Sequence, residues 1–145
     1  MFDPKQEVPS VDLCQRLEEL GLPQDGDGWY WVRELRGYRY KWRLYLFVNY
    51  PYAVQQYRVR ALTTRELEEY FHKLSNARVS IEFYHEGNDP YVRVRVLKDG
   101  AKIIEVSEEY STGKLPNVLA RVLIRLVEDG HVRLSSQQSQ YKEVS

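Results

Sequence analysis

Few residues in this 145-residue chain have the types and spacing that metal binding requires. Glu69 and His72 are three residues apart in an expected helix, which would place two metal ligands on one helical face. A di-metal site also needs a second such pair and two further glutamates from facing helices. Asp25 and Asp27 supply oxygen donors like those of a calcium loop, but Trp29 occupies the next ligand position. We therefore predict a solvated helix face and a turn at these two places.

The residues that could act as a general base or a nucleophile lack suitable partners. His85 is next to Glu86, and such a pair can act as a general base, but no serine or cysteine motif supplies a nucleophile. Cys14, the single cysteine, lies on an apolar helical stripe, where cysteine usually behaves as a small core residue. The chain also lacks a phosphate-binding glycine motif and a dinucleotide fingerprint. We expect no enzymatic activity, no cofactor and no metal.

Binding of a macromolecule is better supported, because one segment is rich in aromatic and basic residues. Eleven of the nineteen aromatic residues, including all three tryptophans, fall between Trp29 and Tyr57. Between Tyr38 and Arg43 aromatic residues alternate strictly with basic ones. In a β-strand, a period of two sends the two sets to opposite faces. The alternation predicts an aromatic face backed by a basic face.

The charge of the chain follows the same division. The formal net charge is zero, but residues 1–28 carry two basic and seven acidic side chains, whereas residues 29–60 carry seven basic and one acidic. A local basic stripe can bind a polyanion, although the acidic N-terminal segment could equally lie against the stripe and neutralise it.

The aromatic and basic segment is expected to form a β-hairpin. With a tight turn at Arg36-Gly37, Trp31 lies opposite Trp42 and Trp29 opposite Leu44, so that all three tryptophans share one face. We expect that face to pack under helices. The opposite face, extended by an Asn-Tyr-Pro-Tyr turn, carries the candidate binding residues: Tyr30, Arg39, Lys41, Arg43, Tyr45, Phe47, Tyr50 and Tyr52.

Three helices have clear end signals. Ser10 and Gly21 bound a short amphipathic helix as N-cap and C′ residue. Thr63 and Glu66 form a capping box before a second helix. An apolar stripe runs from Leu115 to Val127, and Gly130 ends this third helix.

Six strands complete the expected α-βββ-α-βββ-α order. Val54 to Ala61 is expected as the third strand, after the hairpin. Three further strands are expected in a meander: 79–84, 92–96 and 103–106. Since each helix offers one apolar stripe, we predict an α+β fold in which antiparallel sheet, as one sheet or two curved ones, carries the helices on its apolar face. Residues 1–134 are expected to form one domain, followed by a disordered polar tail over 135–145.

The last hairpin of the meander could have either of two registers. A two-residue turn sets Val94 against Glu105. A three-residue loop with Gly100 in the left-handed conformation sets Val94 against Ile104 and Arg93 against Glu105. We favour the second register, because it satisfies both faces of the sheet.

Three stretches of the chain together resemble a known group of proteins. The first runs from Val8-Pro9-Ser10 through Leu17-Glu18-Glu19-Leu20-Gly21 to Trp29-Tyr30-Trp31, the second from Arg60 to Leu67, and the third from Leu119 to Gly130. In this order and spacing the chain resembles small uncharacterised proteins encoded by phages, prophages and related bacterial genomes. The basic alternation departs from that group. The resemblance implies an accessory protein of a mobile element inside a bacterial cell, and it carries over no catalytic residues.

These observations lead to one functional expectation. We predict a non-enzymatic protein that binds another protein or associates with itself through the basic and aromatic face, and nucleic-acid binding by the same face is the alternative. The chain has no apolar run long enough for a membrane span and no N-terminal signal segment. We therefore expect a cytoplasmic protein with no membrane partner.

Overall fold

The computed structural model of the chain describes residues 4–48, 57–75, 77–109 and 114–134. These ranges contain four helices and six strands. In chain order the elements are α1 Pro4–Glu7, α2 Val11–Glu19, β1 Gly28–Arg36, β2 Arg39–Phe47, β3 Arg58–Arg60, α3 Thr64–Ser75, β4 Arg78–Glu86, β5 Asp89–Lys98, β6 Ala101–Glu109 and α4 Leu115–Glu128. The predicted α+β fold is confirmed, and α1 is a short additional helix that the sequence patterns did not predict.

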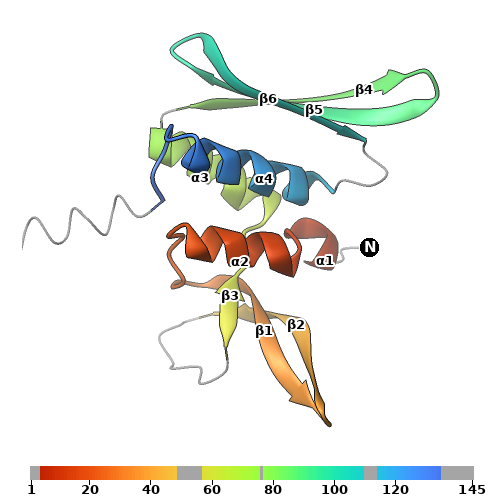
Figure 1. Cartoon of the computed structure of the whole chain (residues 1–145), viewed down its shortest axis with the longest axis vertical. Coiled ribbons are helices and arrows are strands. Elements are labelled where there is room, and N and C mark those ends of the chain that lie inside the picture. Colours follow the sequence, from red (N-terminus) through yellow and green to blue (C-terminus); the bar gives the residue numbers. More distant parts are fainter. Residues whose placement is uncertain (1–3, 49–56, 76, 110–113, 135–145) are drawn as a thin grey trace, which may run out of the picture.

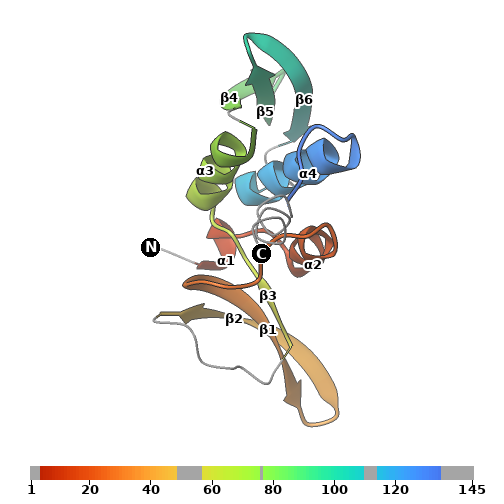
Figure 2. The ribbon, with the colours of Figure 1, turned by 90° about the vertical axis from the view of Figure 1, so that its left-hand side faces the viewer.

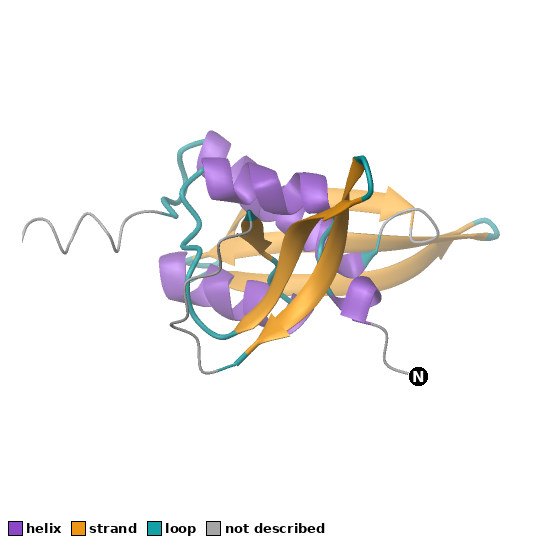
Figure 3. Cartoon of the chain, turned by 90° about the horizontal axis from the view of Figure 1, so that it is seen from below, coloured by secondary structure: helices purple, strands orange, loops and turns teal. Residues whose placement is uncertain are grey.

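The strands form two antiparallel three-stranded sheets, ordered β2-β1-β3 and β4-β5-β6. Figure 1 shows the helices between them, with α3 and α4 next to β4–β6 and with α1 and α2 next to β1–β3. The view turned by 90° shows the same layers (Figure 2). From below, the β1–β3 sheet lies nearest the viewer, in front of the helices (Figure 3).

Two apolar clusters hold these layers together. The larger one joins α2, α3 and α4 to the inner face of β5, where Val92, Val94 and Val96 are completely buried. The smaller one surrounds Trp31, which packs with Val8, Cys14, Val59 and Ala61. Trp29 and Trp42 are partly buried against the smaller cluster, which confirms that the tryptophans turn toward the interior.

Ser10 occupies the N-cap position of α2 as predicted, but its side chain makes no capping hydrogen bond. The C-terminal ends of α2 and α4 match their glycine signals. After α2, the Gly21 N–H donates to Glu18 O (3.0 Å) and the Leu22 N–H to Leu17 O (2.9 Å), the two bonds of a Schellman motif. Gly130 ends α4 in the same manner.

At the start of α3 the predicted capping box is present. Thr63 N–H donates to Glu66 Oε1 (3.0 Å), and Glu66 N–H donates to Thr63 Oγ1 (3.3 Å). Two backbone donors of the first helical turn are therefore satisfied by side chains.

The predicted register of the first hairpin is wrong by two residues. Gly37 has φ +64° and occupies the first turn position, so that Arg36 pairs with Arg39. Trp31 therefore lies opposite Leu44 rather than Trp42. A shift by two residues keeps every side chain on its predicted face.

The predicted register of the last hairpin is also wrong, although a bulge is present. Asp99 (φ 54°) and Gly100 (φ 80°) form a two-residue turn, and the bulge follows it, between the pairs Leu97–Lys102 and Val96–Ile104. The turn takes the conformation that Asp-Gly prefers, and the extra residue in β6 restores the match of apolar faces. Glu105 consequently pairs with Arg95 rather than Arg93.

The third strand is shorter than the predicted Val54 to Ala61. The structure assigns only Arg58–Arg60 to β3, and residues 49–56 lie outside the described ranges. The predicted tail over 135–145 also lies outside them.

Candidate functional site

The outer side of β2 brings three of the predicted binding residues together. Arg39, Lys41 and Arg43 are all exposed and share one face of the strand, opposite to the tryptophans; we call these three residues the basic face. Successive basic residues are about 7 Å apart, because a strand advances by about 3.4 Å per residue.

Acidic side chains of the described residues neutralise little of the basic face. Within the described ranges, Arg39 and Lys41 have no acidic partner, and Arg43 Nε lies 3.9 Å from Glu34 Oε1. The other sheet differs, because on its outer face Arg93 pairs with Glu82 (2.8 Å) and Arg95 with Glu105 (2.6 Å). The local excess of positive charge is therefore specific to β2, and the outer face of the other sheet does not share it.

Tyr45 and Phe47 continue the basic face and are accessible to different extents. Tyr45 is 37% exposed, and its hydroxyl donates to Glu34 Oε2 (2.7 Å). Phe47 is half-buried and packs edge-on against Tyr30, with the ring centres 5.4 Å apart. Tyr45 thus offers an aromatic surface beside the cations, whereas Phe47 offers less.

Glu34 is the one acidic residue that lies among these cations within the described ranges. The hydrogen bond from Tyr45 lowers the pKa of the Glu34 carboxyl from its ordinary value, and Arg36 and Arg43 add to this effect. The same bond raises the pKa of the Tyr45 hydroxyl. Glu34 therefore stays ionised, and it orients Tyr45 at the border of the basic face.

Tyr30 was expected on the binding face, and the structure corrects this expectation. Its side chain has no exposed surface, and its hydroxyl donates to Gly26 O (2.8 Å). Guanidinium groups lie near its ring, that of Arg60 at 5.2 Å and that of Arg58 at 5.6 Å from the centroid. Both faces of the central strand β1 are covered, because Trp31, whose side chain lies on the opposite face, is buried as well. The predicted binding residues Tyr50 and Tyr52 lie outside the described residues.

A hollow next to the basic face adds a residue that the sequence patterns missed. It has a volume of about 370 Å³ and is lined by Lys5, Arg36, Lys41, Trp42 and Arg43. Lys5 comes from α1, and the only sequence signal for that helix is Pro4, a residue that suits the first helical turn. Four of the five lining residues are cationic, so the hollow favours an anionic group.

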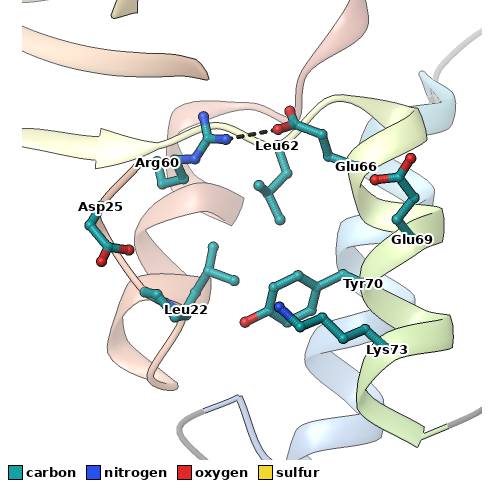
Figure 4. A pocket seen from close by; sticks show the side chains of 9 residues that line it. Leu22, Asp25, Arg60, Leu62, Glu66, Glu69, Tyr70 and Lys73 are labelled. Carbon is teal, nitrogen blue, oxygen red and sulfur yellow. Dashed lines mark hydrogen bonds and ion pairs between the residues drawn. The ribbon is translucent and has the colours of Figure 1, made fainter. Parts of the chain in front are cut away.

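A second concavity, of about 310 Å³, lies between residues 22–25 and α3 (Figure 4). The Tyr70 hydroxyl points into it, and burial, together with nearby Asp25, raises the pKa of Tyr70. Acidic and basic side chains both line the cleft: Asp25, Glu66, Glu69, Arg60 and Lys73.

Arg60, the most buried charged residue of this cleft, holds the fold together. Its guanidinium donates to the carbonyl oxygens of Trp29 (3.0 Å) and Asp27 (2.9 Å) and to Glu66 Oε2 (2.8 Å). It therefore ties β3 to the loop before β1 and to the capping box of α3. Since its donors are occupied within the protein, the cleft is a weaker candidate for binding than the basic face.

The residues with the types needed for metal binding or catalysis do not form a common site in the described part of the chain. Glu69, His72 and His85 are exposed, and no group of three or more histidine, cysteine, aspartate or glutamate side chains that could hold a metal ion occurs in the part of the chain that the structure describes. Cys14 is buried, and burial raises its pKa to about 12. A thiol with this pKa stays protonated near neutral pH and is a poor nucleophile.

Comparison with protein-family models, with curated proteins and with solved structures finds no match to this chain. Of the helices in the described ranges, none is long and apolar enough to cross a membrane.

Proposed function

We propose that this protein acts by binding an acidic surface of another protein through the basic face, with Tyr45 as an aromatic contact. The observation that carries the proposal is the contrast between the two sheets. The outward-facing arginines of β5 are neutralised by nearby carboxylates, whereas Arg39 and Lys41 of β2 have no acidic partner among the described residues. Cations that the fold does not use for itself remain available to a partner, and aromatic residues beside arginines are enriched in the contacts that dominate protein interfaces.

Nucleic acid is the alternative partner, because regularly spaced cations can also follow a phosphate backbone. One feature favours a protein. Tyr45 is held by Glu34, and only about a third of its surface is accessible for stacking on a base.

Charge reversal of the basic face tests the proposal. The variant Arg39→Glu/Lys41→Glu/Arg43→Glu is compared with wild type in affinity capture of binding partners from a host lysate. A matched control, Arg78→Glu/Lys98→Glu/Lys102→Glu, makes the same charge change on three exposed residues of the other sheet. We expect the partner to be lost from the first variant and retained by the second. Equal recovery by all three proteins would contradict the proposal.

Folding and nucleic-acid binding are checked on the same samples. All six positions are exposed, so each substitution should change the free energy of unfolding by no more than about 0.5 kcal/mol. A mobility shift with single-stranded or duplex DNA or RNA that weakens steeply with salt would instead favour the nucleic-acid alternative. No shift at low salt would remove that alternative.

On the resemblance alone, we further propose that the protein is an accessory protein of a phage or related mobile element that acts in the bacterial cytoplasm. The capture experiment in a bacterial lysate tests this setting at the same time.

A further inference from the structure

One side of the β2 backbone has no partner strand in the described part of the chain. The sheet order β2-β1-β3 makes β2 an edge strand, and no described strand pairs with its outer edge. A strand edge carries a row of backbone donors and acceptors, which can pair with another extended segment.

The hydrogen bonds of β1 show which residues of β2 point to that edge. Arg33 N–H donates to Tyr57 O, and Ala61 N–H donates to Trp29 O (both 2.9 Å). The odd-numbered residues of β1 therefore face β3, and the even-numbered ones face β2, because the bonding direction alternates along an antiparallel strand. Through the observed register, Arg39, Lys41, Arg43, Tyr45 and Phe47 bond to β1. The backbone groups of Tyr40, Trp42, Leu44 and Leu46 consequently point outward.

The side chains beside this edge specify what an added strand would carry. On one face it would lie next to the cations of Arg39, Lys41 and Arg43. On the other face it would lie next to Tyr40 and Leu46, which are 60% and 53% exposed. A strand with acidic residues on its first face and apolar residues on its second face complements both, and such a strand alternates the two types in sequence.

The hollow beside β2 supports the acidic half of this pattern. It lies at Trp42, in the middle of the outward-pointing residues, and Lys5, Lys41 and Arg43 line it. An acidic side chain of an added strand would reach it from the basic side, where it would be within range of several cations.

A second copy of this chain fits the edge poorly. If two β2 strands paired edge to edge in an antiparallel manner, the outward-pointing even-numbered residues would lie opposite each other, and so would the odd-numbered ones. Arg39, Lys41 and Arg43 would then lie about 5 Å from the same residues of the other copy, and like charges in this position are destabilising.

We propose that the free edge of β2 binds an extended segment of a partner protein in which acidic and apolar residues alternate, and that this segment becomes a fourth strand of the sheet. This inference rests on the proposed function and deepens it, since it names the partner's conformation and sequence pattern. The acidic side chains contact the basic face, and the apolar ones cover Tyr40 and Leu46.

The experiment uses a labelled nine-residue peptide, as long as β2, in which valine and glutamate alternate. Its binding to the full chain is measured by fluorescence anisotropy at 50 mM and 200 mM salt. A control peptide of the same composition has its glutamates in one block and its valines in another. We expect the alternating peptide to bind at least tenfold more tightly than the block peptide.

Two N-methylated forms of the alternating peptide identify strand addition. In an antiparallel added strand, the N–H groups of the valines point toward β2 and those of the glutamates point to solvent. Methylation of the valine nitrogens should therefore weaken binding by at least tenfold, and methylation of the glutamate nitrogens should change it by less than threefold. Equal effects of the two patterns, or no preference for the alternating peptide over the block peptide, would overturn strand addition.

The charge-reversal variant separates failure of the inference from failure of the proposed function. If Arg39→Glu/Lys41→Glu/Arg43→Glu loses the peptide but both methylation patterns act equally, the basic face binds acidic segments and strand addition is wrong. If this variant binds the peptide as wild type does, or if wild type does not bind the peptide at all, the inference is overturned, whereas the capture experiment still decides the proposed function.

Discussion

Gly28 and Arg60 are in a contact that one added methyl group would break. Gly28 opens β1 with φ +142°, a conformation that residues with side chains rarely adopt. A Cβ atom at this position would overlap with the guanidinium of Arg60. Arg60 is only 6% exposed and is held by Trp29, Asp27 and Glu66. We therefore predict that Gly28→Ala both strains the backbone and displaces this guanidinium.

The two effects can be given separate magnitudes. Backbone strain of this kind costs about 1 to 2 kcal/mol. Hydrogen bonds to a charged group contribute about 1.5 to 3 kcal/mol each, but the groups around Arg60 keep other partners. Trp29 O also accepts from Ala61 N–H, and Glu66 also accepts from Thr63 N–H. Loss of the Arg60 contacts should thus cost about 2 to 3 kcal/mol in total, and Gly28→Ala about 3 to 5 kcal/mol.

A double-mutant cycle with Arg60→Met tests this reasoning. In the Arg60→Met background the guanidinium is already absent, so Gly28→Ala should cost only its strain, about 1 to 2 kcal/mol. The free energy of unfolding is measured in urea by tryptophan fluorescence, because all three tryptophans lie in the sheet that Arg60 helps to hold.

Gly26→Ala is the matched control. Gly26 also has a positive φ (+90°), but no atom lies within 4 Å of the Cβ position. Its cost should therefore add to that of Arg60→Met within about 0.5 kcal/mol. If Gly28→Ala is additive with Arg60→Met in the same way, the displacement of Arg60 is refuted.

Three further predictions concern single residues. Thr63→Ala should lower the free energy of unfolding by about 1 kcal/mol, because it removes the capping hydroxyl of α3; an unchanged urea midpoint would contradict the role of this cap. Cys14 should not react with iodoacetamide at pH 8 in the folded protein, since burial raises its pKa to about 12, and should react after unfolding in urea; rapid labelling of the folded protein would disprove its burial. Tyr45→Phe should raise the pKa of Glu34 toward its ordinary value, measured by NMR titration of the carboxyl, because the hydroxyl is the main cause of the lowered pKa. Since the folded pKa of Glu34 is depressed, the ionised carboxylate stabilises the folded protein above its unfolded pKa of about 4.3. This stabilisation is lost as the pH falls through the folded pKa, and Tyr45→Phe should reduce the amount that is lost. An unshifted Glu34 titration in the variant would exclude the hydrogen bond.

Local signals predicted the elements of this fold well. Gly21 and Gly130 end their helices through bonds that involve only the last turn, and the Thr63 and Glu66 capping box involves only the first. The strict alternation in β2 placed the tryptophans and the cations on opposite faces, and the structure confirms that division. In each case the physical cause lies within a few residues of the signal.

The wrong predictions concern features that depend on residues distant in sequence or on the exact position of a turn. The turn at Gly37 lies one residue further along the chain than predicted, and this difference shifts the register of the hairpin by two residues. The bulge after Lys102 depends on the match between β6 and the valines of β5, so that the turn sequence alone could not reveal it. Tyr30 was expected at the surface because its strand alternates, but β1 is a central strand with both faces covered. The burial of Tyr30 involves Phe47 and Arg60, which lie far from it in sequence.

The two apolar clusters have a consequence for how the molecule unfolds. Cys14 and Leu17 lie one turn apart on α2, yet Cys14 belongs to the smaller cluster and Leu17 to the larger. The consecutive residues Ala61 and Leu62 are divided in the same way. Each apolar cluster therefore contains residues from segments that also pack in the other cluster. Loss of one cluster consequently removes packing contacts from the other. We expect a single unfolding transition in which tryptophan fluorescence, although confined to one sheet, reports on both, and we expect that neither half of the α-βββ repetition could fold without the other.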